Sequence, residues 1–257
     1  MNYIVEICTG SYEDCIAAAK GGAKRVELNS ALSVGGLTAS LAVLKRVKKE
    51  TDLKVICMVR PRAAGFCYGE EEYLIMLEEA ALLLDHGADG IAFGFLHADA
   101  TVNVEYTNQM TERIHSYQKE AVFHRAFDVT KDPIQSIEQL IACKVDRVLT
   151  SGQCAKAIQG IDLIRELQIR YGKQIEILAG SGVNANNVKE LFSKTGINQV
   201  HSSCKSFKED PTTFYHQVSY AYLPAPHERE YDIVDEQLVQ QLVQEVKELK
   251  KEMDLEK

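Results

Sequence analysis

The chain has 257 residues, of which 46% are hydrophobic, and its formal net charge at pH 7 is −8. This length and composition allow a large buried core, in one α/β domain or in two smaller domains. The acidic balance gives no basic patch, so we expect neither nucleic acid nor an anionic membrane as a partner. The remaining partner classes are a metal ion, a small molecule and another protein chain.

The seven cysteines are an odd number, lie far apart and include no C-x-x-C pair. This pattern argues against a disulfide framework and against a zinc knuckle, so we expect reduced thiols. The segment MNYIVEICTG lacks the basic and long apolar regions of a secretion signal, and no run approaches the roughly 18 apolar residues of a membrane span. We therefore expect a cytoplasmic protein.

Short β-branched runs alternate with longer amphipathic stretches, such as EEEYLIMLEEAALLLDHG (70–87), as in repeated strand–helix units of a parallel sheet. Eight such units in about 220 residues match a single (β/α)8 barrel, the TIM barrel. A doubly wound open sheet is the alternative, but GSG at 180–182 is too short for a G-x-G-x-x-G motif. The predicted strands are 3–8, 25–29, 54–60, 90–96, 121–127, 147–151, 176–181 and 199–203.

In such a barrel, the carboxyl ends of the strands and the loops after them form the functional mouth. Alternation along each strand sends every second side chain inward. In AVFHRAFD (121–128) it places His124, Ala126 and Asp128 inside, and leaves Arg125 outside to pair with an acidic residue in the helix layer or near the rim. The polar residues expected inside or at the rim are Glu6, Cys8, Glu27, Asn29, Arg60, Arg62, His124, Asp128, Ser151, Ser181 and His201.

Polar groups that converge from separate strands are typical of barrel active sites. We predict Glu27, Arg60, His124 and Asp128 as catalytic candidates, with Glu27 or His124 as a general base and Arg60 as the clamp for an anion. The alternative is a self-satisfied polar network, in which Glu27 neutralises Arg60 and His124 is only hydrogen-bonded.

Two loops add a second signal, because TSGQ (150–153) and AGSGVN (179–184) follow the sixth and seventh predicted strands. Glycine there lets backbone N–H groups approach an anion, and barrels often hold phosphate with the loops after strands seven and eight. Ordinary turns and helix capping by Asn184 or Asn186 explain the same sequence. The anion-binding candidates are Arg62, Ser151, Gly152, Gly180, Ser181, Gly182 and His201.

A metal site is a separate possibility at the same mouth. Cys8 and His201 suit a soft or borderline metal ion if they meet there, because thiolates select Cu(I) or zinc. Lone buried cysteines elsewhere in the chain usually behave as small hydrophobic residues.

The C-terminal region is predicted to be a linker followed by a long polar helix over residues 232–254. Its apolar residues follow the spacing of a helix that packs along a seam, and they are Val239, Leu242, Val246, Leu249 and Met253. We therefore divide the chain into a barrel, residues 1–223, and a linker with a helix, residues 224–257. The helix packs either on the barrel or on a partner subunit, and a homodimer is the expected assembly.

Nine segments resemble, in the same order, the signature segments of the CutC copper homeostasis family: VEICTGS, RVELNSALSVGGLTAS, MVRPRAAGFCYGEEEYLIML, GADGIAFGFL, FHRAFDVTKDP, DRVLTSG, GIDLI, ILAGSGVNANN and VHSSCKS. The match spans roughly residues 3 to 235, and its MVRPR…GFCY and FHRAFD blocks are specific to the family.

The resemblance implies a cytoplasmic, usually oligomeric TIM barrel that binds copper as Cu(I). In the family, two cysteines at the ends of the first two strands are suggested as ligands. Cys8 falls on the first, but Asn29 stands at the second, and an amide is a poor Cu(I) ligand. Because an arginine and a phosphate-like loop suit an anion better than a cation, the alternative is an enzyme acting on a phosphorylated or carboxylated small molecule, with its reaction class open.

Overall fold

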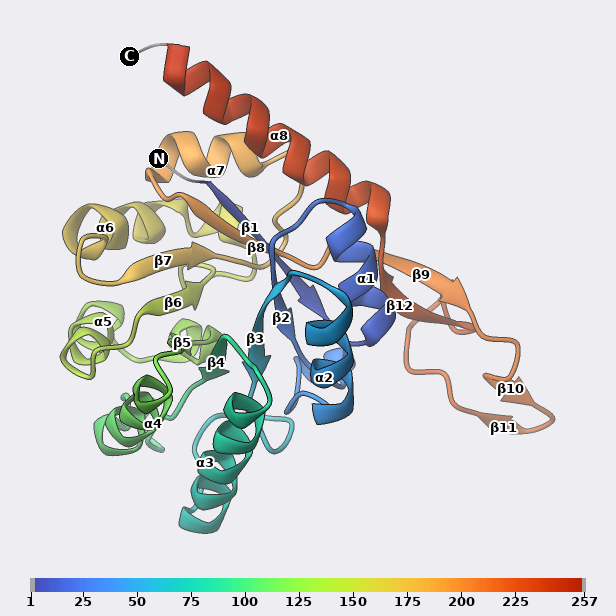
Figure 1. Ribbon diagram of the computed structural model, residues 1–257, viewed down its shortest axis with the longest axis horizontal. Helices are drawn as coiled ribbons and strands as arrows, with labels where there is room; N and C mark the ends of the chain where they lie inside the picture. The colour runs from blue at the N-terminus through green and yellow to red at the C-terminus, as the bar shows by residue number, and fades with distance from the viewer. Residues whose placement is uncertain (1–2, 256–257) are drawn as a thin grey trace.

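The computed structural model describes residues 3–255, with side chains described as far as residue 251. Eight parallel strands close into a barrel in chain order and helices surround it (Figure 1), so the predicted (β/α)8 fold with a C-terminal helix is confirmed. No helix within residues 3–255 is both long and apolar enough to cross a membrane. The barrel strands are β1 (Ile4–Thr9), β2 (Arg25–Leu28), β3 (Lys54–Met58), β4 (Gly90–Phe93), β5 (Glu120–Phe123), β6 (Arg147–Thr150), β7 (Glu176–Ala179) and β8 (Gln199–Ser202).

Several helices begin after a residue whose side chain caps them. Asp132, for example, accepts hydrogen bonds from the backbone N–H groups of Ile134 and Gln135, and Pro133 occupies the first turn, where its missing N–H costs nothing. The helices are α1 (Tyr12–Lys20), α2 (Leu41–Glu50), α3 (Glu70–Asp85), α4 (Val104–Ser116), α5 (Pro133–Ala142), α6 (Ile161–Tyr171), α7 (Val188–Thr195) and α8 (Glu236–Leu255), with 3-10 turns η1 (Leu32–Val34), η2 (Arg125–Val129) and η3 (Ala157–Gln159).

The barrel interior contains a small apolar cluster and a group of buried charges. A small hydrophobic cluster from β3, β4 and β5 lies apart from the main core between the strands and the helices, and consists of Ile56, Met58, Ala92 and Val122. The charged groups lie at the amino-terminal end of the barrel. Arg147, only 2% exposed, pairs with Glu120 at 2.7 Å and with Glu176 at 3.0 Å. These charges are compensated within the protein, as burial requires.

Helix α8 takes the eighth place in the outer ring, where it packs against α1 and α7 (Figure 1). Four of its five predicted seam residues are buried in the main core, namely Val239, Leu242, Val246 and Leu249. The fifth, Met253, lies outside the described side chains. The predicted apolar face therefore covers the barrel of its own chain.

Between β8 and α8 the chain leaves the barrel as an antiparallel ribbon of β9 (Lys205–Glu209) and β12 (Glu230–Val234). The short hairpin of β10 (Phe214–Tyr215) and β11 (Val218–Ser219) extends from this ribbon away from the barrel (Figure 1). The predicted division between residues 223 and 224 falls within this excursion.

The predicted fifth strand is wrong at its carboxyl end, since β5 ends at Phe123 and η2 follows. His124 caps this turn, because its Nδ1 accepts a hydrogen bond from the Ala126 N–H at 3.1 Å. Strand alternation no longer applies after this point. Ala126 and Phe127 are therefore neighbours in sequence that are both buried in the core between barrel and helices, and Ala126 does not face the barrel interior as we expected.

Candidate functional site

The carboxyl ends of the strands surround a cavity of about 520 Å³, within the usual range for small-molecule sites. Eight of the predicted site residues lie on its walls: Cys8, Glu27, Arg60, His124, Asp128, Ser181, Gly182 and His201. Four predicted anion-binding residues do not line it, namely Arg62, Ser151, Gly152 and Gly180. Barrel closure thus brings most of the predicted residues together.

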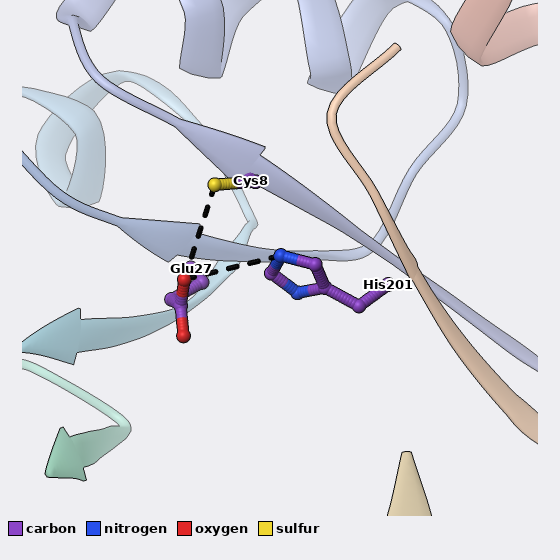
Figure 2. A group of neighbouring side chains, drawn as sticks. All are labelled: Cys8, Glu27 and His201. Carbon is purple, nitrogen blue, oxygen red and sulfur yellow. Dashed lines mark hydrogen bonds and ion pairs between the residues drawn. The ribbon is translucent and has the colours of Figure 1, made fainter. Parts of the chain in front are cut away.

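Cys8, Glu27 and His201 form a compact group on three adjacent strands. Cys8 on β1 is the register partner of Glu27 on β2, while β8, which carries His201, pairs with β1 on its other edge. Figure 2 shows the three side chains pointing toward one another. Glu27 Oε2 lies 3.9 Å from both Cys8 Sγ and His201 Nε2, and one ligand atom from each residue lies within 4.8 Å of the others.

This spacing fits a metal ion. Thiolate, imidazole and carboxylate ligands bind at about 2.0–2.3 Å, which leaves ligand atoms roughly 3.3–4.5 Å apart around one ion. The sulfur of Cys8 and the imidazole of His201 suit copper or zinc, while the Glu27 oxygen is a harder ligand. The three residues could therefore hold one ion with little rearrangement.

A second carboxylate orients the histidine. Glu6 Oε1 lies 2.9 Å from His201 Nδ1, which leaves Nε2 directed at Glu27. Burial alone would raise the pKa of Glu6, but Arg25, 2.5 Å away, and His201 hold it well below its usual value. An ionised carboxylate behind a histidine is typical of metal centres, where it fixes the ring and leaves the other nitrogen free to coordinate.

The three candidate ligands are protonated more readily than usual. Burial raises the pKa of the Cys8 thiol and of the Glu27 carboxyl. Burial opposes charge on His201, but hydrogen bonds with Cys8 and Glu6 and the negative charge of Glu27 together raise the pKa of its imidazole well above the ordinary value. A metal ion bound here would have to displace protons from Cys8 and His201.

Asn29 stands beside this group without the donor chemistry of a cysteine. Its Nδ2 donates to Glu27 Oε2 at 3.0 Å and lies 3.6 Å from Cys8 Sγ. The amide therefore orients the Glu27 carboxylate and touches the thiol. A pair of thiolates is absent at this point of the described structure.

Asp128 is engaged by the loop after β6. Its carboxylate accepts hydrogen bonds from Thr150 Oγ1 (2.5 Å), from the N–H and hydroxyl of Ser151 (3.0 and 2.8 Å) and from the N–H of Gln153 (3.2 Å). Arg125 pairs with it at 2.7 Å, which confirms the expected acidic partner at the rim. The Asp128 carboxylate thus occupies the N–H groups of this loop that we expected to bind an external anion.

The two predicted arginines have different surroundings. Arg62 lies away from the cavity, where it pairs with Glu72 at 2.5 Å and stacks on Tyr68. Arg60 lines the cavity and is buried, and no carboxylate lies within 4 Å of it among the described residues. Glu27, the expected neutralising partner, does not pair with it.

His124 lines the cavity, and its Nε2 is buried. Its Nδ1 accepts a hydrogen bond from Ala126, so the neutral ring carries its proton on Nε2, which has no acceptor among the described residues. Burial first, and then the charge of Arg60, lower the pKa of His124 to about 3. Nε2 therefore has no free lone pair for the general-base role that we considered.

The loop after β7 contains the remaining anion candidates. Gly180 allows close packing, since a Cβ there would lie 2.6 Å from Leu149 Cδ1. Ser181 and Gly182 line the cavity with φ of 81° and 71°, and the Ser181 hydroxyl donates to Ala155 O at 2.8 Å. Gly152, in the neighbouring loop, donates its N–H to Thr150 Oγ1 at 2.9 Å.

Several wall residues were not predicted as site residues. Phe66 comes from the loop after β3, and Asp232 comes from the β9–β12 ribbon at the rim. Glu6 was predicted inside the barrel but without its role behind His201. No strand alternation marks a loop or a ribbon residue, so only a comparison with related sequences could have singled out Phe66.

Comparisons with known proteins agree with this architecture. Residues 3–206 match the CutC family. A CutC family protein of Treponema denticola is 48% identical over 212 residues, which cover 82% of this chain and 85% of that protein. A CutC family protein of Bacteroides fragilis is 42% identical over 207 residues, with 79% and 81% covered.

Among solved structures, a proposed copper homeostasis protein, CutC from Streptococcus agalactiae, superposes with a TM-score of 0.73 at 31% identity and covers 78% of this chain and 98% of its own. Phosphoribosyl anthranilate isomerase from Thermotoga maritima, at 12% identity and a TM-score of 0.56 over 96% of this chain and 99% of its own, shares only the barrel fold. On these matches, the chain belongs to the CutC family.

Proposed function

We propose that the cavity binds copper, with Cys8 Sγ and His201 Nε2 as the principal ligands of Cu(I) and the Glu27 carboxylate beside them. The observation that carries this proposal is that one ligand atom from each of the three residues lies within 4.8 Å of the others. The description of the Streptococcus agalactiae relative as a proposed copper homeostasis protein supports copper over other ions. The reduced thiols this site needs suit a cytoplasmic location.

The chemistry of the donors suits Cu(I). A soft thiolate and an imidazole nitrogen are donors that this ion accepts, and Glu6 leaves the His201 Nε2 lone pair free once the ring is neutral. Asn29 supplies no second thiolate, so the histidine is the partner of Cys8 in this chain.

Competition with a chromophoric Cu(I) chelator under reducing conditions tests the proposal. Cys8→Ser should abolish the tight site, whereas Cys67→Ser, at an exposed cysteine away from the cavity, should leave it unchanged. Unchanged stoichiometry in Cys8→Ser would refute copper binding at this group. Tight Zn(II) binding without Cu(I) binding would refute copper as the metal.

A second candidate function has its own support. The cavity of about 520 Å³ is far larger than a single ion needs, and one of its walls contains the buried Arg60, which pairs with no carboxylate among the described residues. We propose as the alternative an enzyme acting on a phosphorylated or carboxylated small molecule, with Glu27, whose pKa burial raises, as its general acid or base. A thermal-shift screen of metabolites with and without Cu(I) tests it, because a ligand of the folded state raises Tm.

A further inference from the structure

Arg60, Phe66 and His124 form a second group on the cavity wall, separate from the metal candidates. Because the strands close in order from β1 to β8, β5 lies across the barrel from β1. His124 follows β5 and Arg60 follows β3, and the Phe66 ring joins them, with centroid distances of 4.9 Å to the His124 ring and 5.1 Å to Arg60 Cζ.

Arg60 is held firmly but its charge is not balanced. It is 5% exposed, and its Nη atoms donate to three backbone carbonyl groups, those of Val34 (3.0 Å), Gly36 (2.9 Å) and Ala64 (2.5 Å). Carbonyl oxygens fix the guanidinium but carry no net charge. Its Nε has no acceptor among the described residues. A buried charge without a counter-ion costs several kcal/mol, which a bound anion would offset.

His124 adds a neutral donor to the same wall. It is 3% exposed, and its Nε2–H has no acceptor in the described part of the chain. A buried donor left unpaired costs about 1–3 kcal/mol. Since the pKa of His124 is about 3, the ring keeps this donor and stays uncharged at neutral pH. The wall thus contains a positive charge without a carboxylate counter-ion and a buried N–H group without an acceptor, as far as the described residues show.

We propose that Arg60 and His124 form a subsite for the oxyanion of a small organic molecule, a carboxylate or a phosphoryl group. Arg60 balances its charge and the His124 Nε2–H donates to one of its oxygens. The subsite deepens the second candidate function and rests on it. The organic body would extend along Phe66, Met58 and Leu149, which also line the cavity. A copper ion alone needs neither group, because Arg60 repels a cation.

Titration of the metal-free protein with inorganic phosphate and with malonate tests the subsite and distinguishes the two anion types. His124→Phe keeps a ring but removes the donor, and we expect affinity for the preferred anion to fall at least tenfold. His124→Gln retains a donor and should lose less. His97→Phe, at an exposed histidine outside the cavity, should bind as the unmodified protein does.

Nitrogen-edited NMR of the histidine side chains provides a readout that folding changes cannot imitate, because the His124 Nε2–H signal should move when the anion binds. Equal affinity in His124→Phe, or no saturable binding of either anion at millimolar concentration, would overturn the subsite and leave the copper proposal intact. Anion binding without any organic ligand in the metabolite screen would support the subsite and remove the enzyme.

Discussion

The affinity for Cu(I) is expected to rise steeply with pH. In the metal-free protein the Cys8 thiol and the His201 ring hold protons whose pKa values are raised. Groups with a raised pKa stay protonated at neutral pH, so the metal competes with two protons and binds more tightly as the pH increases. Each displaced proton contributes about a tenfold change per pH unit, so the expected slope is about a hundredfold per unit while both groups are protonated.

Two measurements check this slope. Competition with a Cu(I) chelator between about pH 6 and pH 8, corrected for protonation of the chelator, gives the affinity directly. Calorimetry in buffers of different ionisation enthalpy counts the protons that each ion releases. A Cu(I) affinity that is flat over this range, or release of less than one proton per ion, would refute the assignment of Cys8 and His201 as ligands.

Three further substitutions test the surroundings of the copper ligands and the packing of helix α8. Asn29→Cys places a thiol where an amide nitrogen now lies 3.6 Å from the first thiol, and Cu(I) affinity should rise at least about tenfold; an unchanged titration would contradict this placement. Glu6→Gln removes the charge behind His201, so Cu(I) affinity of the folded protein should fall about 10–100-fold, and no loss would mean that this ring is not a ligand. Leu242→Ala, at a fully buried position of α8, should lower the free energy of unfolding by about 2–5 kcal/mol and Tm by roughly 5–15 °C. Leu238→Ala, at an exposed position of the same helix, should change the free energy of unfolding by less than about 0.5 kcal/mol. Equal calorimetric scans of the two variants would contradict the packing of α8.

Much of the fold follows from the sequence because each strand–helix unit repeats the same pattern. The meeting of Cys8, Glu27 and His201 also follows, since two of them come from strand alternation on β1 and β2 and the third from the rule that strand ends share one mouth. Their common role does not follow from the sequence, because we considered Cys8 and His201 together as metal ligands but assigned Glu27 to a catalytic site. Only the register of β1 with β2 and β8 makes them one group.

The errors arise where the chain leaves a strand. After Phe123 the turn η2 replaces alternation, so Asp128 reaches the loop after β6 and satisfies its N–H groups. Arg62 lies two residues after Arg60 in the loop that follows β3. It pairs with Glu72 in the first turn of α3, away from the mouth. Sequence periodicity contains no information about such side-chain partners, which depend on loop geometry.

The contrast between the two ends of the barrel interior decides between a structural network and a binding site. At the amino-terminal end, Arg25 and Arg147 each have carboxylate partners, so a self-satisfied network exists there, although it is not the Glu27–Arg60 network that we considered. At the mouth, Arg60 is similarly buried, but its hydrogen bonds go to carbonyl groups and no carboxylate pairs with it among the described residues. Glu27 lies with Cys8 and His201 instead. Because the same protein compensates its other buried arginines, the missing counter-ion at Arg60 is best explained by an anion that binds from outside.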